Sequence, residues 1–379
     1  MKVYGDWLEH PGTQALCKAI EDAGYQALFV GGCVRNAILG ETVNDVDIAS
    51  DALPQITTHI AEKAGFKVVP TGIEHGTVTV IAEGRPHEVT TFRRDVETDG
   101  RRAVVAFSTH IEDDAARRDF TMNALYADRH GTLIDPLSGL PDLIARRVKF
   151  VGDACERIRE DYLRILRFFR FYAYYGGDDQ GIDPAGLAAC AENSAGIETL
   201  SKERVGAEMR KLLLAPNPLP SISVMAVSGV LSRILRGAST KALGPFLHLC
   251  DENSHSANLV ARLVALGGDV PDVALRLSRS ETRNWLKLHA AVGSSASAGE
   301  LGYELGLEDG LSALLLRAAL LETPVVGVAE LHAGAGAIFP VKAADLPGLS
   351  GAALGAELKK LERKWISSGF QLSRDDLLE

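Results

Sequence analysis

The sequence lacks the features that mark secreted proteins, membrane proteins and metal-thiolate sites. Its 379 residues contain five scattered cysteines and no Cys-x-x-Cys pair, so neither a disulfide framework nor a zinc site is expected. No apolar run approaches the roughly 18 to 20 residues that a membrane span needs, and residues 1–24 lack the pattern of a signal peptide. These absences predict a soluble protein of the cytoplasm that has no membrane partner.

Positive charge is also scarce. The chain has 40 Lys and Arg against 50 Asp and Glu, a net charge of −10, which is unfavourable for a nucleic-acid-binding protein when charge is counted over the whole chain. Binding of RNA would therefore depend on local basic strips. The net charge is not decisive, because it also counts carboxylates that gather around metal ions. The ten histidines form no His-Asp metal pattern, so a phosphohydrolase domain is not supported.

The length of the chain predicts more than one hydrophobic core. Helical and strand patterns alternate before residue 150, whereas the pattern beyond it is helical throughout. We therefore predict an α+β fold in which a head with a small mixed sheet precedes an all-helical part. The predicted domains are a head at residues 1–150, a helical neck at 151–215, and a helical body and tail at 216–379.

Apolar periodicity and breakers place the individual elements. In the head, helices are predicted at residues 11–24 and 54–64 and strands at 66–69, 77–82 and 87–92. Residues 95–102, DVETDGRR, have no core-facing pattern and are predicted to form a mobile loop, in which Arg101 and Arg102 are solvated or touch triphosphate or RNA. Beyond the head, helices are predicted at 153–175, 200–214, 231–249, 259–266, 273–288 and 311–321.

The stretch at residues 28–50 combines several groups suited to a nucleoside triphosphate. An apolar run ends in Gly31-Gly32, which lets the backbone approach a phosphate, and a helical pattern follows with Arg35 on its first turns. Asp45 and Asp47 alternate along the next strand pattern, so their carboxylates are expected on one face. Taken singly, a Gly-Gly pair is more often a tight turn and Asp-x-Asp a solvated strand edge.

Taken together, this run resembles the signature of the polymerase-β-like nucleotidyltransferases, in particular the family of class II tRNA nucleotidyltransferases and bacterial poly(A) polymerases. The resemblance implies that Asp45 and Asp47 hold Mg²⁺ and that Gly31, Gly32 and Arg35 take the phosphates. A third carboxylate is expected in a nearby strand, where Glu88 is the match, although an exposed strand glutamate explains it nearly as well. Asn36 departs from the family, which usually has Asp there.

A second motif, RRDFTMNA at residues 117–124, resembles the RRDFT-x-NA box of the same family. Its Phe120 and Met122 are predicted to anchor the segment in the core. The resemblance implies that Arg118, Asp119 and Asn123 contact the ribose and phosphates of the incoming nucleotide.

A third motif lies in the helix predicted at 153–175. Its charged residues recur at i, i+1, i+4 and i+7, which gathers them on one helix face: Glu160, Asp161, Arg164 and Arg167. Spacing alone favours a solvated ion-pair face. EDYLR nevertheless resembles the family's Glu-Asp-x-x-Arg motif, which implies that Asp161 and Arg164 select cytosine and adenine by their shared donor and acceptor pattern, while Glu160 orients Arg164.

The helical half carries weaker signals. Glu203, Arg204 and Glu208 match the family's Glu-Arg-x-x-x-Glu box and are predicted to brace the base-recognition helix. Near the end of the chain, a helical pattern carries four basic residues that suit either an RNA backbone or an ordinary solvated face: Lys359, Lys360, Arg363 and Lys364.

The resemblance covers about the first 215 residues strongly and implies a CCA-adding tRNA nucleotidyltransferase. Such an enzyme adds C and A from CTP and ATP to the tRNA 3′ end without a template and releases pyrophosphate. A bacterial poly(A) polymerase is a rival, although the acidic ending DDLLE lacks the basic extension that its members tend to carry. An enzyme that adds only C or only A, and a catalytically silent RNA-binding protein, are further alternatives. The sequence does not indicate the oligomeric state.

Overall fold

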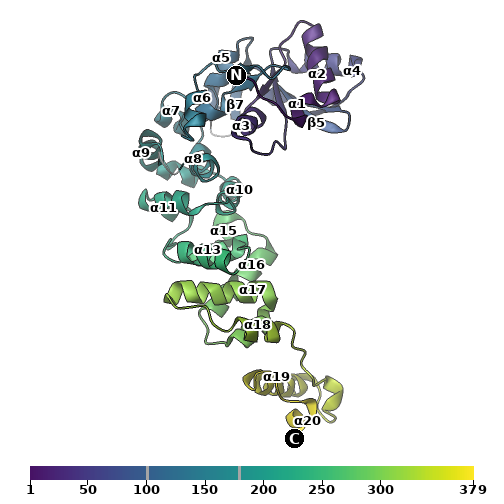
Figure 1. The fold of residues 1–379 in the computed structure, drawn as a ribbon, viewed down its shortest axis with the longest axis vertical. Coiled ribbons are helices and arrows are strands. Elements are labelled where there is room, and N and C mark those ends of the chain that lie inside the picture. The colour runs from purple at the N-terminus through teal and green to yellow at the C-terminus, as the bar shows by residue number, and fades with distance from the viewer. Residues whose placement is uncertain (100–101, 178–180) are drawn as a thin grey trace. The chain divides into compact units, whose positions relative to one another are not determined.

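The computed structural model describes residues 1–99, 102–177 and 181–379, and it shows a sheet-containing N-terminal part followed by helices (Figure 1). This confirms the predicted α+β class. Contacts divide the chain into two compact units, the first formed by residues 1–201, 215–217 and 228–233 and the second by 202–214, 218–227 and 234–379. The first unit includes both the predicted head and the predicted base-recognition helix, and the three-domain division stays a prediction.

The first unit is built around a seven-stranded mixed sheet with the strand order β3-β4-β5-β2-β1-β8-β9. Strands β2 and β5 are parallel, and the other neighbouring pairs are antiparallel. The mixed sheet was expected, and the three strands predicted after residue 65 correspond to β3, β4 and β5. The bounds are β1 Leu28–Val30, β2 Asp47–Ser50, β3 Lys67–Gly72, β4 Thr77–Ala82, β5 Arg85–Thr91, β8 Tyr126–Ala127 and β9 Leu133–Ile134.

Two helices of the head begin at proline residues. Pro11 and Pro54 occupy the first turns of α2 (Pro11–Asp22) and α4 (Pro54–Lys63), positions where the missing proline N–H has no helical partner to lose. Both helices pack against β4, whose alternating residues Val78 and Val80 are fully buried. The other head helices are α1 Asp6–Glu9, α3 Gly32–Leu39, α5 Ile111–Ala116, α6 Leu140–Ile144, η1 Ile73–His75 and η2 Thr121–Asn123.

A buried histidine connects β5 to α2 by a hydrogen bond. His87 is 1% exposed, and its Nε2 lies 2.8 Å from the Thr13 hydroxyl while its Nδ1 lies 3.1 Å from the Arg85 carbonyl oxygen. A carbonyl only accepts, so Nδ1 donates its proton there and Nε2 accepts from Thr13. Burial lowers the pKa of His87 below its ordinary value, which keeps the ring neutral in this role.

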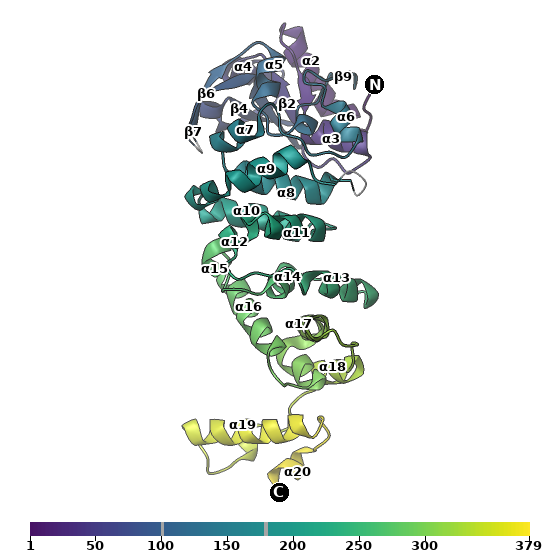
Figure 2. The ribbon, with the colours of Figure 1, turned by 90° about the vertical axis from the view of Figure 1, so that its left-hand side faces the viewer.

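The predicted loop at residues 95–102 was wrong, because most of it belongs to a β-hairpin. Strands β6 (Arg93–Asp99) and β7 (Arg102–Phe107) pair antiparallel in a sheet of their own, with a register shift between Asp95 and Glu97 (Figure 2). Polar composition suggested a loop, but a two-stranded ribbon satisfies backbone groups without covering a core. Arg101 lies outside the described residues.

The single helix predicted at 153–175 was also wrong. The structure has α7 (Ala154–Glu160) and α8 (Leu163–Tyr175), separated at Asp161, whose backbone is extended with φ −154° and ψ 104°. The Asp161 carboxylate accepts a hydrogen bond of 3.1 Å from the Leu163 N–H, so it takes up a donor at the start of α8. The first unit continues with α9 Pro184–Glu192 and η3 Ser194–Thr199.

The second unit is helical. Its predicted helix at 259–266 is confirmed as α14, whereas the helices predicted at 231–249 and 273–288 are each two helices in the structure. The residues predicted at 311–321 are the last part of a longer helix that contains a kink at Gly306. The bounds from residue 202 onward are α10 Lys202–Leu213, α11 Leu219–Val227, α12 Val230–Ile234, α13 Leu243–Glu252, α14 Leu259–Leu266, α15 Asp272–Leu275, α16 Arg279–Val292, α17 Ala298–Leu321, α18 Val328–Ala335, η4 Ala343–Asp345, α19 Gly351–Ser367 and α20 Arg374–Leu378.

Helices α17 and α18 approach each other backbone to backbone. A Cβ on Gly302 would overlap the carbonyl oxygen of Leu331, and one on Gly334 would overlap the carbonyl oxygen of Gly299. Glycine is therefore required at these crossings because no side chain fits between the two backbones. Within the three described segments of the chain, no helix is both long enough and apolar enough to cross a membrane.

We expect Gly302→Ala to lower the free energy of unfolding by about 2 kcal/mol or more, because the added methyl forces α17 and α18 apart. Gly355→Ala is the matched control, since a Cβ there meets no atom within 4 Å in α19 and alanine is the better helix former. Urea unfolding of both variants tests this. Equal stability of Gly302→Ala and the parent would contradict the packing described.

Candidate active site

Gly31 forms the turn between β1 and α3. Its backbone has φ 71° and ψ −116°, a conformation that favours glycine. A Cβ at this position would lie 3.4 Å from Nη1 of Arg118, so the turn and this guanidinium are neighbours. The first N–H groups of α3 have no partner within the helix, and with Arg118 they make an environment suited to an anion.

Three acidic residues cluster at the start of β2, the strand that pairs with β1. Asp47 is the first residue of β2 and is in register with Glu88 on the parallel strand β5. Asp45 precedes the strand and does not belong to it, although the sequence placed both aspartates on one strand. Burial, then the negative charges of Glu88 and Asp45, raise the pKa of Asp47 to about 6, while Arg118 acts in the opposite direction. The carboxylates are therefore close enough to repel one another.

No group of three or more His, Cys, Asp or Glu side chains within residues 1–99, 102–177 and 181–379 is arranged to hold a metal ion by itself. Asp47 is half-buried, while Asp45 and Glu88 are exposed. The donors present are carboxylate oxygens, the ligands that Mg²⁺ prefers, and Mg²⁺ is commonly held by one or two carboxylates together with substrate phosphates. The residues therefore fit a magnesium ion that binds with a nucleotide.

Arg118 is held by a carboxylate that the sequence analysis missed. Asp114 on α5 is 1% exposed; Arg118 and Arg117 donate to it at 2.9 and 2.8 Å, and the Tyr126 hydroxyl donates at 2.7 Å. Burial alone would raise the pKa of Asp114, but the two arginines and the hydroxyl lower it to about 2. The spacing Asp114, Arg117, Arg118 on a helix was the available signal.

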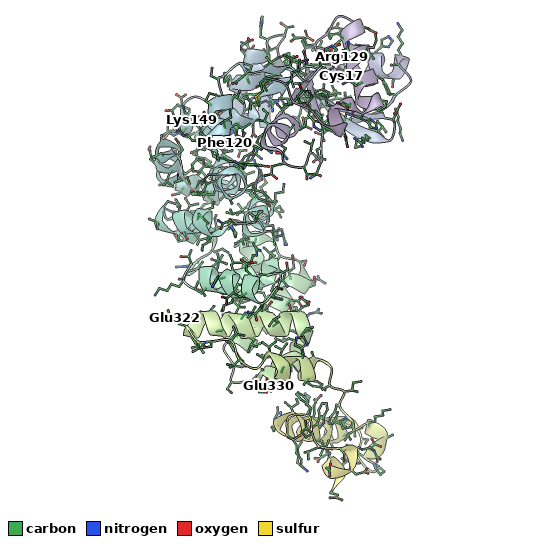
Figure 3. The ribbon with its side chains drawn as sticks, in the orientation of Figure 1. Cys17, Phe120, Arg129, Lys149, Glu322 and Glu330 are labelled. Atoms are coloured by element: carbon green, nitrogen blue, oxygen red, sulfur yellow. The ribbon has the colours of Figure 1, made fainter. Side chains whose placement is uncertain are left out.

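The rest of the RRDFTMNA motif connects the sheet to α8. Phe120, which is labelled in Figure 3, and Met122 are fully buried, as predicted. The Phe120 ring packs on the ring of Phe150. Asp119 is buried too, and its carboxylate accepts from the Asn123 amide at 2.9 Å and from Nε of Arg167 at 2.7 Å. Burial opposes ionisation of Asp119, yet Arg167 and these hydrogen bonds hold its pKa below the ordinary value.

Arg35 has protein partners on every side. Its side chain donates to the side-chain oxygens of Asn123, Asn36 and Tyr175. The residue is 7% exposed. The Asn36 amide in turn donates to the Thr42 carbonyl at 2.8 Å. The guanidinium also lies near the glycine pair, since a Cβ on Gly32 would be 3.9 Å from Nη2 of Arg35. A phosphate role for Arg35 stays a prediction.

The predicted base-recognition residues flank the break between α7 and α8. Glu160 accepts from both Arg164 and Arg157. Arg164 also donates to the carbonyl oxygens of Arg157 at 2.8 Å and Arg117 at 3.2 Å. The expected pairing of Glu160 with Arg164 is present, although the four residues do not share one continuous helix because Asp161 is extended.

The remaining predicted residues lie in the second unit. Glu203, Arg204 and Glu208 are on α10, where Glu208 is buried and Glu203 accepts from Arg276 at 2.8 Å; their bracing role stays a prediction. The basic side chains predicted to hold RNA are exposed on α19, and Leu361 and Trp365 of the same helix are buried. The helix is amphipathic with a basic outer face, and the RNA-binding role of these residues stays a prediction: Lys359, Lys360, Arg363 and Lys364.

We expect Asp114→Asn to lower the free energy of unfolding at pH 7 by about 2 kcal/mol. This is the stabilisation that corresponds to a carboxyl whose pKa falls from 3.8 to about 2 on folding. The folded-state pKa is the lower one, so the parent has this stability above pH 4 and loses it as the pH falls towards 2. Urea unfolding across this range measures it, with Glu112→Gln, an exposed acid on the same helix, as control. Parallel profiles for Asp114→Asn and the parent would refute the role of Asp114.

Comparison with known proteins gives the geometry a family context. Residues 27–149 match a family described as the poly A polymerase head domain, and residues 181–241 match one described as a probable RNA and SrmB-binding site of polymerase A. The CCA tRNA nucleotidyltransferase 1, mitochondrial, of Mus musculus is 31% identical over 387 residues, which cover 97% of this chain and 89% of the relative. The CCA-adding enzyme of Streptococcus gordonii is 43% identical over 226 residues, 59% of this chain and 55% of that protein.

Solved structures agree with the fold. The CCA-adding enzyme of Bacillus stearothermophilus in complex with CTP is 27% identical, covers 94% of this chain and 92% of its own, and has a TM-score of 0.69. The Thermotoga maritima CCA-adding enzyme complexed with tRNA is 19% identical with a TM-score of 0.70 and covers 100% and 98% of the two chains; at this identity the likeness concerns the fold alone. With a nearly full-length relative above 30% identity, this chain belongs to the family of CCA-adding tRNA nucleotidyltransferases, which are enzymes.

Proposed function

We propose that this protein adds C and A from CTP and ATP to the 3′ end of tRNA without a nucleic-acid template. The observation that carries the proposal is that the Gly31 turn, the Arg118 guanidinium and the Asp47 carboxylate lie together where the central strand β1 ends and its neighbour β2 begins. An anion-binding turn beside a cluster of acids suits a nucleoside triphosphate that arrives with divalent cations. Membership of the CCA-adding family supports the choice of nucleotides and acceptor.

The metal ligands in this proposal are Asp45, Asp47 and Glu88. Their mutual repulsion contributes to the raised pKa of Asp47. A divalent cation bound between the carboxylates would reduce this repulsion. When bound, Mg²⁺ would make the tRNA 3′-hydroxyl a better nucleophile and neutralise the triphosphate. Protonated Asp47 cannot act as a ligand, so cation binding should weaken below about pH 6.

In this mechanism the triphosphate is bound by Arg118 and by the first N–H groups of α3, which follow the Gly31 turn. The 3′-hydroxyl oxygen attacks the α-phosphorus and loses its proton to water, so a new P–O bond forms. The bond from the α-phosphorus to the oxygen that bridges it to the β-phosphate breaks, and pyrophosphate leaves. Arg118 is suited to the leaving group because Asp114 and Tyr126 fix its orientation. Asp119 and Asn123 have a supporting role in this mechanism. The Asn123 amide donates a hydrogen bond to the Asp119 carboxylate, and this contact holds the RRDFTMNA motif in place.

The base is selected at the break between α7 and α8. Cytosine and adenine both show an amino donor next to a ring-nitrogen acceptor, which a carboxylate and a guanidinium can match. Asp161 and Arg164 supply these groups, and Glu160 orients Arg164. Guanine and uracil present the opposite pattern and would leave the protein groups unpaired.

The exposed basic face of α19, formed by Lys359, Lys360, Arg363 and Lys364, is proposed to contact the tRNA backbone. Contacts of this kind position the RNA without reading its sequence. We keep the cytoplasm as the proposed compartment.

Incubation with tRNA lacking its last one, two or three nucleotides, together with single labelled nucleotides, tests the proposal directly. Ordered incorporation of C, C and A supports it. Addition of one nucleotide only identifies a C-adding or A-adding specialist, a long A tail identifies a poly(A) polymerase, and absence of transfer with retained tRNA binding identifies a silent RNA-binding protein.

We expect Asp47→Ala to abolish transfer of both nucleotides, because the only half-buried carboxylate of the set is removed from the metal site. Binding of Mn²⁺ in the presence of a non-hydrolysable CTP analogue, measured by calorimetry, should be lost as well. Glu41→Ala, an exposed acid just after α3, is the control. Transfer by Asp47→Ala at the rate of the control would exclude the proposed metal site.

We expect Arg164→Ala to weaken base selection while some transfer remains, since the metal and phosphate groups are intact. Loss of one charged hydrogen bond predicts a fall of about 10- to 100-fold in the preference for CTP over UTP. Competition between labelled nucleotides measures the preference, and Arg159→Ala on α7, an exposed arginine, is the control. Unchanged selection by Arg164→Ala would refute the base-recognition assignment.

A further inference from the structure

Arg35 occupies a closed protein environment at the far end of α8. Its Nη2 donates to the Tyr175 hydroxyl at 2.7 Å, and its guanidinium carbon lies 4.1 Å from the Tyr175 ring centroid and 5.2 Å from that of Phe171. Asn36 accepts from its Nε and Nη2 at 3.1 and 2.9 Å, and Asn123 accepts from Nη1. Stacking on aromatic faces and hydrogen bonding both satisfy a buried cation.

These contacts form part of a closed ring of side chains. From Arg35 the ring passes to Asn123, whose amide donates to Asp119, and from Asp119 to Arg167. Arg167 and Tyr175 belong to α8 and are two turns apart on one helix face, so the ring closes through the helix. The ring therefore connects α8 to Arg35 of α3 twice, directly at Tyr175 and through Asp119 and Asn123 at Arg167.

The two elements that the ring joins contact opposite ends of the same nucleotide in the proposed mechanism. Helix α3 begins at the Gly31 turn that receives phosphates, and α8 begins beside Asp161 and Arg164, which contact the base. A base held by α8 presents its α-phosphate correctly only if α3 keeps its place relative to α8. Small errors of such placement reduce rates strongly.

We propose that Arg35 and Tyr175 are positioning residues that form a latch between the phosphate-binding turn and the base-recognition helix. The inference rests on the proposed function. Both arginines lie near the glycine pair, since a Cβ on Gly31 would be 3.4 Å from Nη1 of Arg118 and one on Gly32 would be 3.9 Å from Nη2 of Arg35. A phosphate-binding role for Arg35 would nevertheless require its guanidinium to leave Asn123, Tyr175 and the ring stack. In the latch, Arg35 supplies no contact to substrate.

A latch and a phosphate ligand predict different kinetics. Loss of a phosphate ligand weakens binding of every phosphate-bearing ligand, including pyrophosphate, and Tyr175 has no part in it. Loss of the latch leaves pyrophosphate binding unchanged and lowers kcat, because the nucleotide binds but reaches the reactive arrangement less often. Arg35 and Tyr175 then act as one unit, so their effects do not add.

The test compares Arg35→Ala, Tyr175→Ala and the double variant with the parent, on tRNA lacking its terminal A with ATP and on tRNA lacking its final C and A with CTP. We expect each single variant to lower kcat by about 10- to 100-fold, with KM little changed and the double variant no worse than the lower single one. Pyrophosphate binding, measured by calorimetry, should equal that of the parent. Tyr4→Ala, at an exposed tyrosine of the same unit, is the matched control.

Tyr175→Phe keeps the ring and removes only the hydroxyl, so it preserves packing and should give a smaller loss than Tyr175→Ala; it replaces the alanine variant if that variant does not fold. Weaker pyrophosphate binding by Arg35→Ala with parent-like kinetics of Tyr175→Ala and Tyr175→Phe would overturn the latch. Absence of transfer by the parent would instead reject the proposed function. In that case amide hydrogen exchange decides, since opening of the latch should raise exchange in α8 of Tyr175→Ala, and unchanged exchange would refute it.

Discussion

The carboxylate of Asp119 is the contact on which the first unit depends. It is buried, and its two oxygens accept from the Phe120 N–H, the Asn123 amide and the Arg167 guanidinium. An ionised carboxylate in such a place is tolerated only when its donors are in position, and removal of one partner from a buried pair costs about 3 to 5 kcal/mol. The turn of the RRDFTMNA motif and helix α8 are therefore held together by one group, and the phosphate side and the base side of the site have a common support.

Carboxylates also determine how the positive charge of the site is used. Asp114 holds two arginines, and Glu160 holds two more. A net charge of −10 is therefore a poor guide to what the site binds, because acids that orient arginines enter the total with the same sign as acids that repel a phosphate. What matters is the placement of each guanidinium. Arg118 lies beside Gly31 with its orientation fixed by Asp114, whereas Arg35, although close to Gly32, donates to Asn36, Asn123 and Tyr175.

Elements whose pattern reflects burial were predictable from the sequence, whereas the β6–β7 ribbon and the break at Asp161 were not. The alternation of Val78 and Val80 in β4 and the apolar anchors Phe120 and Met122 follow from the need to fill a core. The β6–β7 hairpin was missed because a ribbon outside the main sheet needs no apolar face. The break at Asp161 was missed because its carboxylate competes with the helix for a backbone N–H, an effect that periodicity does not contain.

Within the site, local spacing was informative and long-range partners were not. The four-residue separation of Glu160 and Arg164 indicated their pairing, and the same spacing could have indicated Asp114 with Arg118. Two of the three hydrogen-bond partners of Arg35, Asn123 and Tyr175, come from positions 88 and 140 residues away, which no local pattern can specify. The sequence thus identified the residues of the motif, while the fold decides which of them face the nucleotide and which face one another.

The hydrogen bond between Thr13 and His87 has a consequence for the acidic cluster, because His87 immediately precedes Glu88. Side chains alternate along a strand, so a slip of β5 by one residue relative to β2 would turn the carboxylate inward and the imidazole outward. Such a slip would break the only side-chain bond that His87 makes to α2 among the described residues and would bury an unpaired acid. The neutral imidazole of His87, on the buried face of β5, thereby sets the alignment of the strand. This alignment keeps the Glu88 carboxylate on the exposed face.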